Sequence, residues 1–252
     1  MTITGSDIPE GYDPSKFPAF AVTVDVVIFT MVESELHVLL IQRGQQPFQG
    51  MWAIPGGFKL PGETLDEAAA RELFEETSVS TAALLKQFGA YGDPGRDPRM
   101  NVVTVAYIAV VHEIGAIVAG TDAAHASLVP VSDVVKKNFS LAFDHKKILL
   151  DALERVRVEL GVSGVAAAFV GKTFTLAELR EVYEQVWNVE FDGANFRRSI
   201  AKEEGWLLPT GQLAPPGPDG GKPAELFRAG AAWKSGAPIR RPRKSIVRKE
   251  GR

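Results

Sequence analysis

Five charged side chains recur at fixed intervals in the segment from Gly57 to Val79, which reads GFKLPGETLDEAAARELFEETSV. They are Glu63, Arg71, Glu72, Glu75 and Glu76. Neighbouring carboxylates repel one another unless a cation joins them. Oxygen-rich acidic sites favour Mg²⁺ or Mn²⁺, and these ions commonly bridge to the phosphates of a ligand. The segment therefore predicts a metal-assisted site for a phosphate-containing compound.

A helix that begins at Leu65 is expected to carry the arginine and three of these glutamates. Thr64 and Glu67 have the spacing of a capping box, in which each side chain bonds the backbone N–H of the other residue. With about 3.6 residues per turn, Glu72 and Glu76 lie about 40° apart around the helix axis. The two glutamates should therefore form one acidic edge.

The same helix offers an ionic brace and an apolar face. Arg71 and Glu75 are one helical turn apart, so their side chains can pair. The apolar stripe that is expected to dock on a sheet consists of Ala69, Ala70 and Leu73. The alternative is an ordinary surface helix with a lattice of i, i+4 charges. The length of the pattern and the preceding glycine pair, Gly56 and Gly57, favour a ligand site.

A second helix, predicted over Gly193–Glu204, carries hydrogen-bond donors on its outer face. Phe196 and Ile200 share the inward face. The outer face presents Asn195, Arg198, Ser199 and Lys202, with Arg197 at its flank. Side chains of these types contact the base edges and phosphates of DNA. The alternative is the ordinary solvated face of a surface helix. This helix alone does not show whether its outer face binds DNA or is simply solvated.

The first part of the chain predicts strands interleaved with helices. Runs rich in Val and Ile predict strands at Phe20–Thr30, Leu36–Arg43, Ala83–Tyr91 and Val102–Val111. Loops are expected at Gly44–Trp52 and Gly92–Asn101. A helix over Asp144–Val158 follows, with an apolar face of Ile148, Leu149, Ala152, Leu153 and Val156. This order predicts an α/β layered domain from about Phe20 to Leu160.

The second part predicts a winged helix-turn-helix. The small residues of Gly161–Gly171 suit a linker or a short element. Thr175 and Glu178 form a second capping box, and the helix that follows runs to Trp187. The elements expected after it are a turn at Asn188–Asp192, the donor-bearing helix, and short strands at Trp206–Leu208 and Ala224–Arg228 around a loop, Pro209–Pro223. Helix, turn, helix and hairpin is the order of a winged helix-turn-helix.

Composition restricts the classes of protein that this chain can belong to. Its 252 residues, 45% of them hydrophobic, suffice for one large domain or two small ones. The absence of cysteine excludes disulfides, zinc–thiolate sites and thiol chemistry. No apolar run approaches the roughly 20 residues of a membrane span, and Met1–Pro18 lacks the basic start of a signal peptide. We therefore expect a cytoplasmic protein without a membrane partner.

The net charge of -3 is unevenly distributed along the chain. Residues 1–160 contain 13 Lys and Arg against 21 Asp and Glu, whereas residues 161–252 contain 15 against 10. The last stretch, Arg240–Arg252, has seven basic residues and one acidic residue, and is predicted to be a mobile tail. An acidic first part and a basic second part indicate two kinds of partner, the second of them DNA.

The Gly57–Val79 segment resembles the signature of the Nudix family, whose enzymes cleave nucleoside diphosphates linked to another moiety. The resemblance implies an α/β/α sandwich with a mixed sheet. It assigns Mg²⁺ or Mn²⁺, bound together with the ligand, to Glu72, Glu75, Glu76 and the Gly57 carbonyl. Glu63 would support these ligands.

The C-terminal module resembles that of the Nudix-related transcriptional regulators of NAD metabolism, the NrtR family. The resemblance rests on Thr173–Arg180, Tyr183 and Phe196–Arg198, and the loop Tyr91–Arg99 is similar to that of the regulators and of ADP-ribose pyrophosphatases. It implies a homodimeric repressor of NAD biosynthesis or salvage genes, which ADP-ribose or a related NAD metabolite releases from operator DNA. The implied divisions are an arm (1–18), a Nudix effector domain (19–160), a winged helix-turn-helix (161–236) and a basic tail (237–252).

Three departures from the Nudix pattern bear on catalysis. Ser78 stands where a glycine is usual, and serine adopts positive φ only at a cost, so a changed helix exit is expected. His125 and Leu128, in a loop that follows Asp122, stand where active relatives often have an acid and a tryptophan. These changes imply weak or lost hydrolysis. The alternative is a Mg²⁺-dependent ADP-ribose pyrophosphatase with an accessory C-terminal domain, in which catalysis would use Glu63, Arg71, Glu72, Glu75 and Glu76.

Five residues are candidates for contacts with ADP-ribose, namely Arg43, Trp52, Gly57, Arg96 and Arg99. For the last two arginines the alternative role is a brace within their own turn, paired with Asp93 or Asp97. Trp52 could stack on adenine, and its alternative role is packing in the core.

Overall fold

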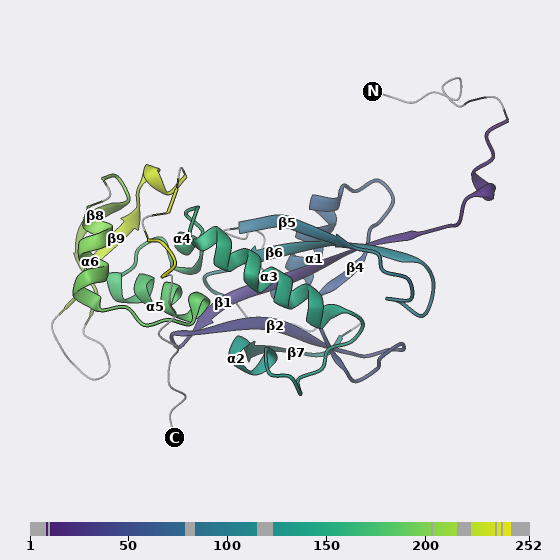
Figure 1. The fold of residues 1–252 in the computed structure, drawn as a ribbon, viewed down its shortest axis with the longest axis horizontal. Coiled ribbons are helices and arrows are strands. Elements are labelled where there is room, and N and C mark those ends of the chain that lie inside the picture. Colours follow the sequence, from purple (N-terminus) through teal and green to yellow (C-terminus); the bar gives the residue numbers. More distant parts are fainter. Residues whose placement is uncertain are drawn as a thin grey trace.

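The structure, a computed structural model, describes residues 9, 11–78, 84–114, 123–202, 204–215, 223–234, 236–237 and 239–242. One mixed sheet lies between helices, and a smaller, mostly helical part with a two-stranded hairpin lies beside it (Figure 1). The chain ahead of the sheet extends away from it as an arm that contains a short 3-10 helix, η2 (Pro14–Lys16). This is the predicted α/β sandwich with a mixed sheet, followed by a part with the predicted order of a winged helix-turn-helix.

Among the described residues the large sheet has seven strands. The order is β3-β2-β1-β6-β5, with β4 paired to β1 and β7 paired to β2. β1 and β6 run parallel, and the other pairs are antiparallel. The strands are β1 (Ala21–Val32), β2 (Glu35–Arg43), β3 (Trp52–Ala53), β4 (Gly56–Phe58), β5 (Leu84–Tyr91), β6 (Val102–Val110) and β7 (Ala123–Pro130). The four longest predicted strands are confirmed with small changes at their ends, whereas β3, β4 and β7 were not predicted.

Helices cover both faces of this sheet. α1 (Leu65–Thr77) packs on one face and α3 (His145–Leu160) on the other, with the short α2 (Val131–Val134) beside β7. Val26 and Ile28 of β1 belong to the α1 side of the core, whereas Val27 and Phe29 belong to the α3 side. Alternate strand residues point to opposite faces, so a central strand covered on both faces must be apolar throughout.

The predicted apolar face of α3 is confirmed, since all five of its members are buried. The predicted stripe of α1 is wrong at one position. Ala69 and Leu73 are buried, but Ala70 is exposed and Ala68 takes its place. Ala68 lies one turn before Glu72, and both face the sheet. The acidic edge therefore borders the buried side of α1 rather than its outer surface.

The C-terminal part has the predicted order of elements. α4 (Ala166–Phe169) precedes α5 (Leu176–Trp187) and α6 (Gly193–Ala201), and then β8 (Leu207–Leu213) pairs with β9 (Glu225–Ala229). A short 3-10 helix, η3 (Ala231–Lys234), follows. α6 ends three residues before its predicted end, and β8 extends into the segment that was expected to be a loop. A bridge between Phe174 and Phe227 ties the start of this part to the hairpin.

The two parts share a continuous apolar core. Val165, Ala168 and Phe169, inside the expected linker, are buried in the cluster that also contains residues of α3 and α5. The segment Gly161–Gly171 is therefore a packed short element, and of the two possibilities left by its sequence the loose linker is wrong. Ser34, between β1 and β2, also donates a hydrogen bond of 2.7 Å to Glu181 of α5.

Reciprocal hydrogen bonds join α3 to the end of α5. Trp187 Nε1 donates to the Arg157 carbonyl at 2.8 Å, and Arg157 Nε donates to the Val186 carbonyl at 2.9 Å. Two such bonds, together with the shared core, fix the orientation of α5 on α3.

The residue just ahead of the predicted mobile tail is buried, and the start of the tail makes an ion pair. Ile239 is buried in the shared core, and Arg241 pairs with Glu154 of α3 at 3.1 Å. Residues 243–252 of the tail lie outside the described residues. In the described part of the chain, no helix has both the length and the apolar character required to span a membrane.

Candidate functional site

The local sequence positions α1 as predicted. Thr64 accepts a hydrogen bond from Glu67 N at 3.2 Å, and Glu67 accepts one from Thr64 N at 2.7 Å, so both halves of the capping box are present. Ser78 ends the helix in the left-handed conformation, with φ of 56°. The expected change of helix exit is therefore wrong. Serine adopts the geometry that a glycine would, and its N–H bonds the Phe74 carbonyl at 2.8 Å.

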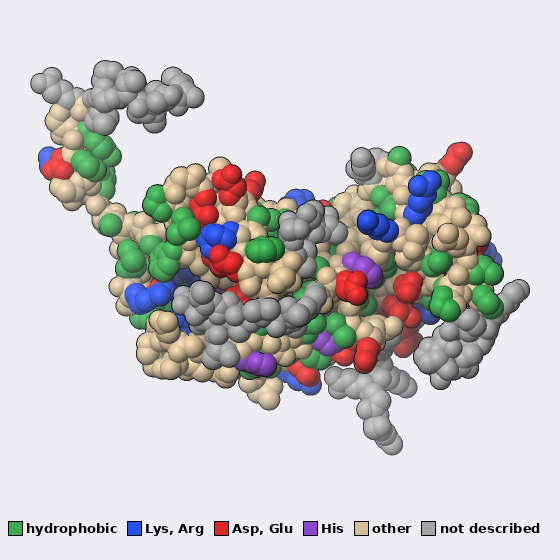
Figure 2. Space-filling view, turned by 180° about the vertical axis from the view of Figure 1, so that it is seen from behind, with side chains coloured by type: hydrophobic (Ala, Val, Ile, Leu, Met, Phe, Trp, Pro, Cys, Tyr) green, Lys and Arg blue, Asp and Glu red, His purple; other side chains and the backbone are tan. Residues whose placement is uncertain are grey.

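Arg71 is the cation that joins the carboxylates around α1. Its guanidinium lies 2.6 Å from Glu72, 3.1 Å from Glu63 and 3.5 Å from Glu75. The hydrogen bond with Glu63 is the largest cause of a raised pKa for Arg71, so the guanidinium stays charged. The predicted brace between Arg71 and Glu75 is confirmed as one of three pairs. Acidic side chains surround a basic one over α1 in the space-filling view (Figure 2).

Gly57 lies directly against the end of the Glu72 side chain. A Cβ atom at position 57 would collide with Glu72 Oε1 unless the carboxylate moved. Glu72 is buried, and burial raises the pKa of its carboxyl group although Arg71 opposes this shift. A desolvated carboxylate beside a backbone turn is a place where a cation is stabilising.

The donor atoms at this edge suit a hard divalent cation, but the side chains do not form a ready site. Carboxylates of α1 and the Gly57 carbonyl are oxygen donors of the type that Mg²⁺ and Mn²⁺ prefer. Within the described residues, however, no three His, Asp or Glu side chains converge as metal ligands. Arg71 holds Glu72 and Glu75 instead. An ion at this edge would need a rearrangement of these side chains or oxygens supplied by the ligand.

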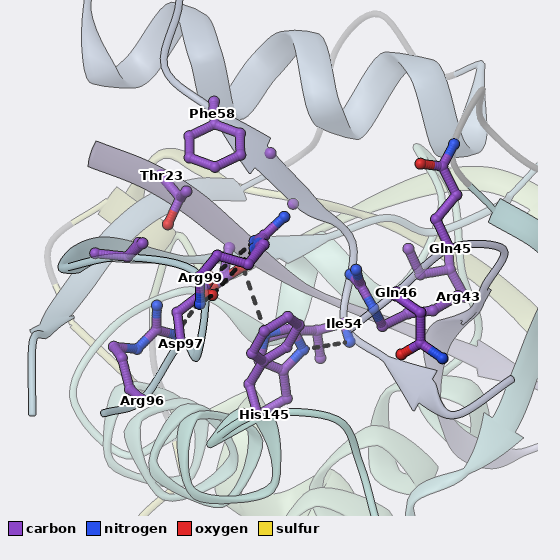
Figure 3. A pocket seen from close by; sticks show the side chains of 16 residues that line it. Thr23, Arg43, Gln45, Gln46, Ile54, Phe58, Arg96, Asp97, Arg99 and His145 are labelled. Atoms are coloured by element: carbon purple, nitrogen blue, oxygen red, sulfur yellow. Dashed lines mark hydrogen bonds and ion pairs between the residues drawn. The ribbon is translucent and has the colours of Figure 1, made fainter. Parts of the chain in front are cut away.

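A pocket adjoins this edge and is rich in arginine (Figure 3). Its volume is about 140 Å³. Strands β1, β2, β4 and β6, the loop between β5 and β6, and the start of α3 contribute to it. The polar and aromatic side chains of the wall are Thr23, Asp25, Arg43, Gln45, Gln46, Phe58, Arg96, Asp97, Arg99, Phe143 and His145. Gly57 lines the same pocket, so the acidic edge and the arginines border one space.

Arg96 is held by two acidic residues that are distant in sequence. Its guanidinium makes two hydrogen bonds to Asp144, of 2.7 and 3.0 Å, and lies 3.5 Å from Asp25. Only 5% of the Arg96 side chain is exposed. Its alternative role as a brace with Asp93 or Asp97 is therefore wrong. Arg96 instead ties the β5–β6 loop to the central strand and to the start of α3.

Arg99 is the arginine that braces its own turn. It makes two side-chain hydrogen bonds to Asp97, of 2.7 and 3.0 Å. Burial tends to raise the pKa of Asp97, but the bonds from Arg99 outweigh burial and lower it. The same guanidinium lies over the rings of Phe58 and Phe143, at 5.4 and 5.9 Å from their centroids. Arg99 thus stands at the pocket wall with its planar group already oriented.

Arg43 reaches the pocket from the end of β2, as its position in the sequence suggested. Its Nε donates to the Pro47 carbonyl at 2.7 Å, and its guanidinium lies 4.8 Å from the centre of the Phe143 ring. Phe143 therefore lies against two of the three pocket arginines.

His145 occupies the buried floor of the pocket. The Ile54 N–H donates to its Nδ1 at 3.1 Å, and Nε2 lies 3.8 Å from Asp25 Oδ1. Burial lowers the pKa of His145, and Asp25 opposes this shift only in part. An Nδ1 that accepts a hydrogen bond requires the neutral ring with its proton on Nε2.

The protein is expected to lose stability as the pH falls below about 6.5, the ordinary pKa of histidine. The folded form keeps His145 neutral, so the unfolded form binds a proton first and gains stability from it. The loss therefore begins near the unfolded pKa and stops growing below the lowered folded pKa. Thermal unfolding between pH 8 and pH 5 would measure it. His145→Gln, which retains an acceptor but does not titrate there, should flatten the curve, and an equally steep curve would contradict the assignment.

Trp52 and His125 lie outside the lining of this pocket. Trp52 packs against the core on the α3 side, which agrees with its alternative role rather than with stacking on adenine. His125 is exposed and lies in β7 opposite Gln42, so its expected loop position is wrong. Leu128 is also in β7 and packs against the core on the α1 side. Asp122 lies outside the described residues.

α6 presents the predicted donors to the surface. Asn195, Arg197, Arg198, Ser199 and Lys202 are all exposed, whereas Phe196 and Ile200 are buried. Asp192 caps the helix by accepting from Asn195 N at 2.8 Å. Arg198 donates a hydrogen bond to the Asn195 side chain, which orients both groups.

Two family models match the chain in succession. The NUDIX domain model matches residues 20–152, and the NrtR DNA-binding winged helix domain model matches residues 166–229. The chain is 32% identical over 219 residues to the ADPR responsive transcriptional repressor NtrR of Acinetobacter baylyi, covering 86% of this chain and 85% of that protein. The chain belongs to the NrtR family of Nudix-related transcriptional regulators.

One solved structure of NrtR from Shewanella oneidensis resembles this NrtR-family chain over both parts, and a second resembles its Nudix part. The structure of that protein with a 27mer DNA superimposes with a TM-score of 0.70 and 30% identity, covering 85% of this chain and 98% of the other. The structure of its NUDIX domain with ADP ribose superimposes with a TM-score of 0.54 and 35% identity, covering 61% of this chain and 99% of the other.

Sequence reasoning missed several pocket residues of this NrtR-family chain. Asp25, Asp144, His145 and Phe143 were not among the predicted site residues, although all but Asp144 line the pocket and Asp144 holds Arg96. One signal was available, since Asp25 is the only charged residue in the apolar run of β1. An acidic residue in a strand buried on both faces needs a partner, and here that partner is Arg96.

Proposed function

We propose that this protein is a DNA-binding transcriptional repressor whose Nudix pocket binds ADP-ribose and thereby releases the operator. One observation carries the proposal: the same chain has an arginine-lined pocket beside the helix of the Nudix signature, and a helix, α6, whose exposed side chains are hydrogen-bond donors. A relative that is ADPR responsive and a similar structure bound to DNA support it. The regulated genes would be those of NAD biosynthesis or salvage.

The pocket suits a ligand with both anionic and planar groups. Arg43, Arg96 and Arg99 provide positive charge, and Phe58 and Phe143 provide aromatic surface beside them. A pyrophosphate can lie between these arginines and the edge formed by Gly57 and the α1 glutamates. The pocket is small for the whole of ADP-ribose, so part of the ligand would extend beyond its mouth.

Membership of the Nudix family implies the use of a divalent cation. We propose Mg²⁺ or Mn²⁺, held by Glu72, Glu75, Glu76 and the Gly57 carbonyl, with Glu63 and Arg71 positioning these groups. When bound, such an ion neutralises phosphate charge and orients the pyrophosphate. Because Arg71 pairs with the carboxylates in the described structure, the ion would bind together with the ligand, whose phosphate oxygens complete its coordination.

α3 supplies a physical link between the pocket and the DNA-binding part. Arg96 grips Asp144, which immediately precedes α3, and the far end of α3 is bonded to α5 through Arg157. A ligand anion that competes for Arg96 would weaken its hold on α3. Binding can shift the balance between two arrangements only through contacts that differ between them, and the Arg96–Asp144 pair is such a contact.

We propose further that the protein is a homodimer. Each chain would consist of an N-terminal arm (1–18), a Nudix effector domain (19–160), a winged helix-turn-helix domain (161–236) and a basic tail (237–252).

The second candidate function is a Mg²⁺-dependent ADP-ribose pyrophosphatase. The complete set of glutamates on α1 favours it, since no predicted ligand is missing. Mg²⁺-dependent release of AMP from ADP-ribose at enzyme-like rates, abolished by Glu76→Gln, would establish this activity. The same assay with a protein that still binds DNA would reveal whether sensing and hydrolysis coexist.

A mobility-shift assay on the DNA upstream of NAD genes, with and without ADP-ribose, tests the proposed function. We expect a specific shift at physiological salt that ADP-ribose reverses. If no specific shift is observed, the protein is not a repressor of these genes. A specific shift that ADP-ribose leaves unchanged would retain DNA binding but overturn the choice of effector.

Arg198→Ala is expected to weaken operator binding by about 1–3 kcal/mol, because a bidentate contact to a base has that worth. Affinity for ADP-ribose should stay unchanged, since Arg198 is exposed on α6. Fluorescence anisotropy with labelled operator would measure the affinity for DNA, and calorimetry would measure the affinity for ADP-ribose. Equal loss of both affinities would indicate misfolding rather than a lost base contact. Arg155→Ala on α3 is a matched control that should leave both unchanged.

A further inference from the structure

A second cationic feature lies on the DNA-binding part, between the first turns of α5 and α6. It is a groove of about 430 Å³ lined by two arginines, Arg180 and Arg197, and by five small or apolar residues. No described carboxylate lines it. A groove with two positive charges and no negative one is a site for an anion rather than for a neutral or cationic group.

Arg180 is held in this groove rather than free in solvent. Its side chain is 31% exposed, and its nearest acidic atom, Glu184 Oε1, lies 3.5 Å from Nε. The buried Nε has no hydrogen-bond partner among the described residues. Glu184 is occupied in another way, since the same oxygen accepts from Phe191 N at 2.7 Å. The carboxylate therefore positions the guanidinium without saturating its donors.

Arg180 reaches from α5 to the first turn of α6 at Gly193. A Cβ atom at position 193 would lie 2.5 Å from Arg180 Nη1, so the guanidinium lies directly against this turn. Arg197 stands one turn further along α6 and is exposed. The two guanidinium groups thus come from different helices to one groove.

The backbone of both helices adds to the positive character of this groove. Thr175 and Asp192 cap α5 and α6 by accepting from the third residue of each helix. The N–H groups of the first two residues, which belong to lining residues of the groove, have no acceptor within their own helices. They support an anion there, and the two arginines supply its charge partners.

We propose that Arg180 and Arg197 form a clamp for one phosphodiester of the DNA backbone, distinct from the face of α6 that reads bases. This inference rests on the proposed DNA-binding function. Arg180, on α5, makes no contact with a base. Its contact with the phosphate fixes the position of α6 on the duplex. The clamp contributes equally to all DNA sequences, because the backbone carries no sequence information.

Binding to duplex DNA of arbitrary sequence over a range of salt concentrations tests the clamp. The double variant Arg180→Gln/Arg197→Gln should weaken this binding about tenfold. The slope of log affinity against log salt should fall in magnitude by about 0.9, the value for one phosphate contact. Operator DNA should lose affinity by the same factor, so the preference for operator over arbitrary DNA stays constant. Arg180→Lys/Arg197→Lys, which keeps both charges, should retain the slope.

Lys86→Gln is the matched control for loss of charge, since Lys86 lies in β5 and pairs with Glu159. It should leave the salt slope unchanged. If the glutamine double variant folds, binds DNA and keeps the wild-type slope, the clamp is wrong although the repressor function stands. A lower melting temperature with an unchanged slope would assign Arg180 to bracing Glu184 instead. If the wild-type protein binds no DNA, the proposed function fails and the clamp fails with it.

Discussion

Arg96→Ala is expected to lower the free energy of unfolding by about 3–5 kcal/mol, the cost of removing one partner from a buried ion pair. Arg96 is 5% exposed, and the Asp25 and Asp144 side chains that it joins are 8% and 19% exposed. Without the guanidinium, two partly desolvated carboxylates stand beside each other with no cation between them. Urea unfolding at neutral pH would measure the loss.

Arg155→Ala provides the matched control for Arg96→Ala. Arg155 also pairs with a carboxylate, Glu159, at 2.8 Å, but its side chain is 46% exposed. Exposed pairs of this kind contribute about 0.3–0.5 kcal/mol. If Arg96→Ala were as mild as Arg155→Ala, the Arg96 pairs would not be structural, and the proposed hold of the pocket on α3 would lose its basis.

The parts of this fold that the sequence predicted well are those with local causes. α1 begins at the predicted residue because the capping box involves only Thr64 and Glu67, three positions apart. The winged helix-turn-helix was predicted from the order of its elements, and α6 buries Phe196 and Ile200 as their spacing required. Short strands such as β3 and β4 were missed, because pairing with distant strands creates them rather than their own composition.

Four of the five predicted ligand residues line the pocket, but the partners that hold them were not predicted, because these contacts join distant parts of the chain. The sequence offers Asp93 and Asp97 as neighbouring partners for Arg96, whereas its partner in the fold, Asp144, lies 48 positions away. His145 meets Ile54 across 91 positions. Nothing in the local pattern at either site indicates such pairs. The sequence identified the arginines as candidates, but only the fold reveals which of them is buried and which braces a turn.

Trp187→Ala is expected to cost about 3–5 kcal/mol, as removal of a large aromatic side chain from a core does. Trp187 is 2% exposed and packs with Tyr183 and Phe191, and Phe191 in turn packs with Phe196 of α6. Its loss should therefore loosen the anchoring of α6 as well as the contact with α3. Chemical unfolding and operator binding would both register the change.

Trp187→Phe separates the two effects, because it keeps most of the ring volume but deletes the 2.8 Å bond from Nε1 to the Arg157 carbonyl. Leaving that carbonyl unpaired costs about 1–3 kcal/mol. The variant should still bind the operator. ADP-ribose should weaken this binding less than in the wild type, because α3 is then held less firmly against α5.

Trp233→Phe is the matched control. Trp233 Nε1 also donates to a carbonyl, that of Trp206, within the winged helix-turn-helix part. If both variants respond fully to ADP-ribose, the effector signal does not pass through the α3–α5 contact. If both lose the response, the cause is general loosening of the DNA-binding part, and only a selective loss in Trp187→Phe supports α3 as the link.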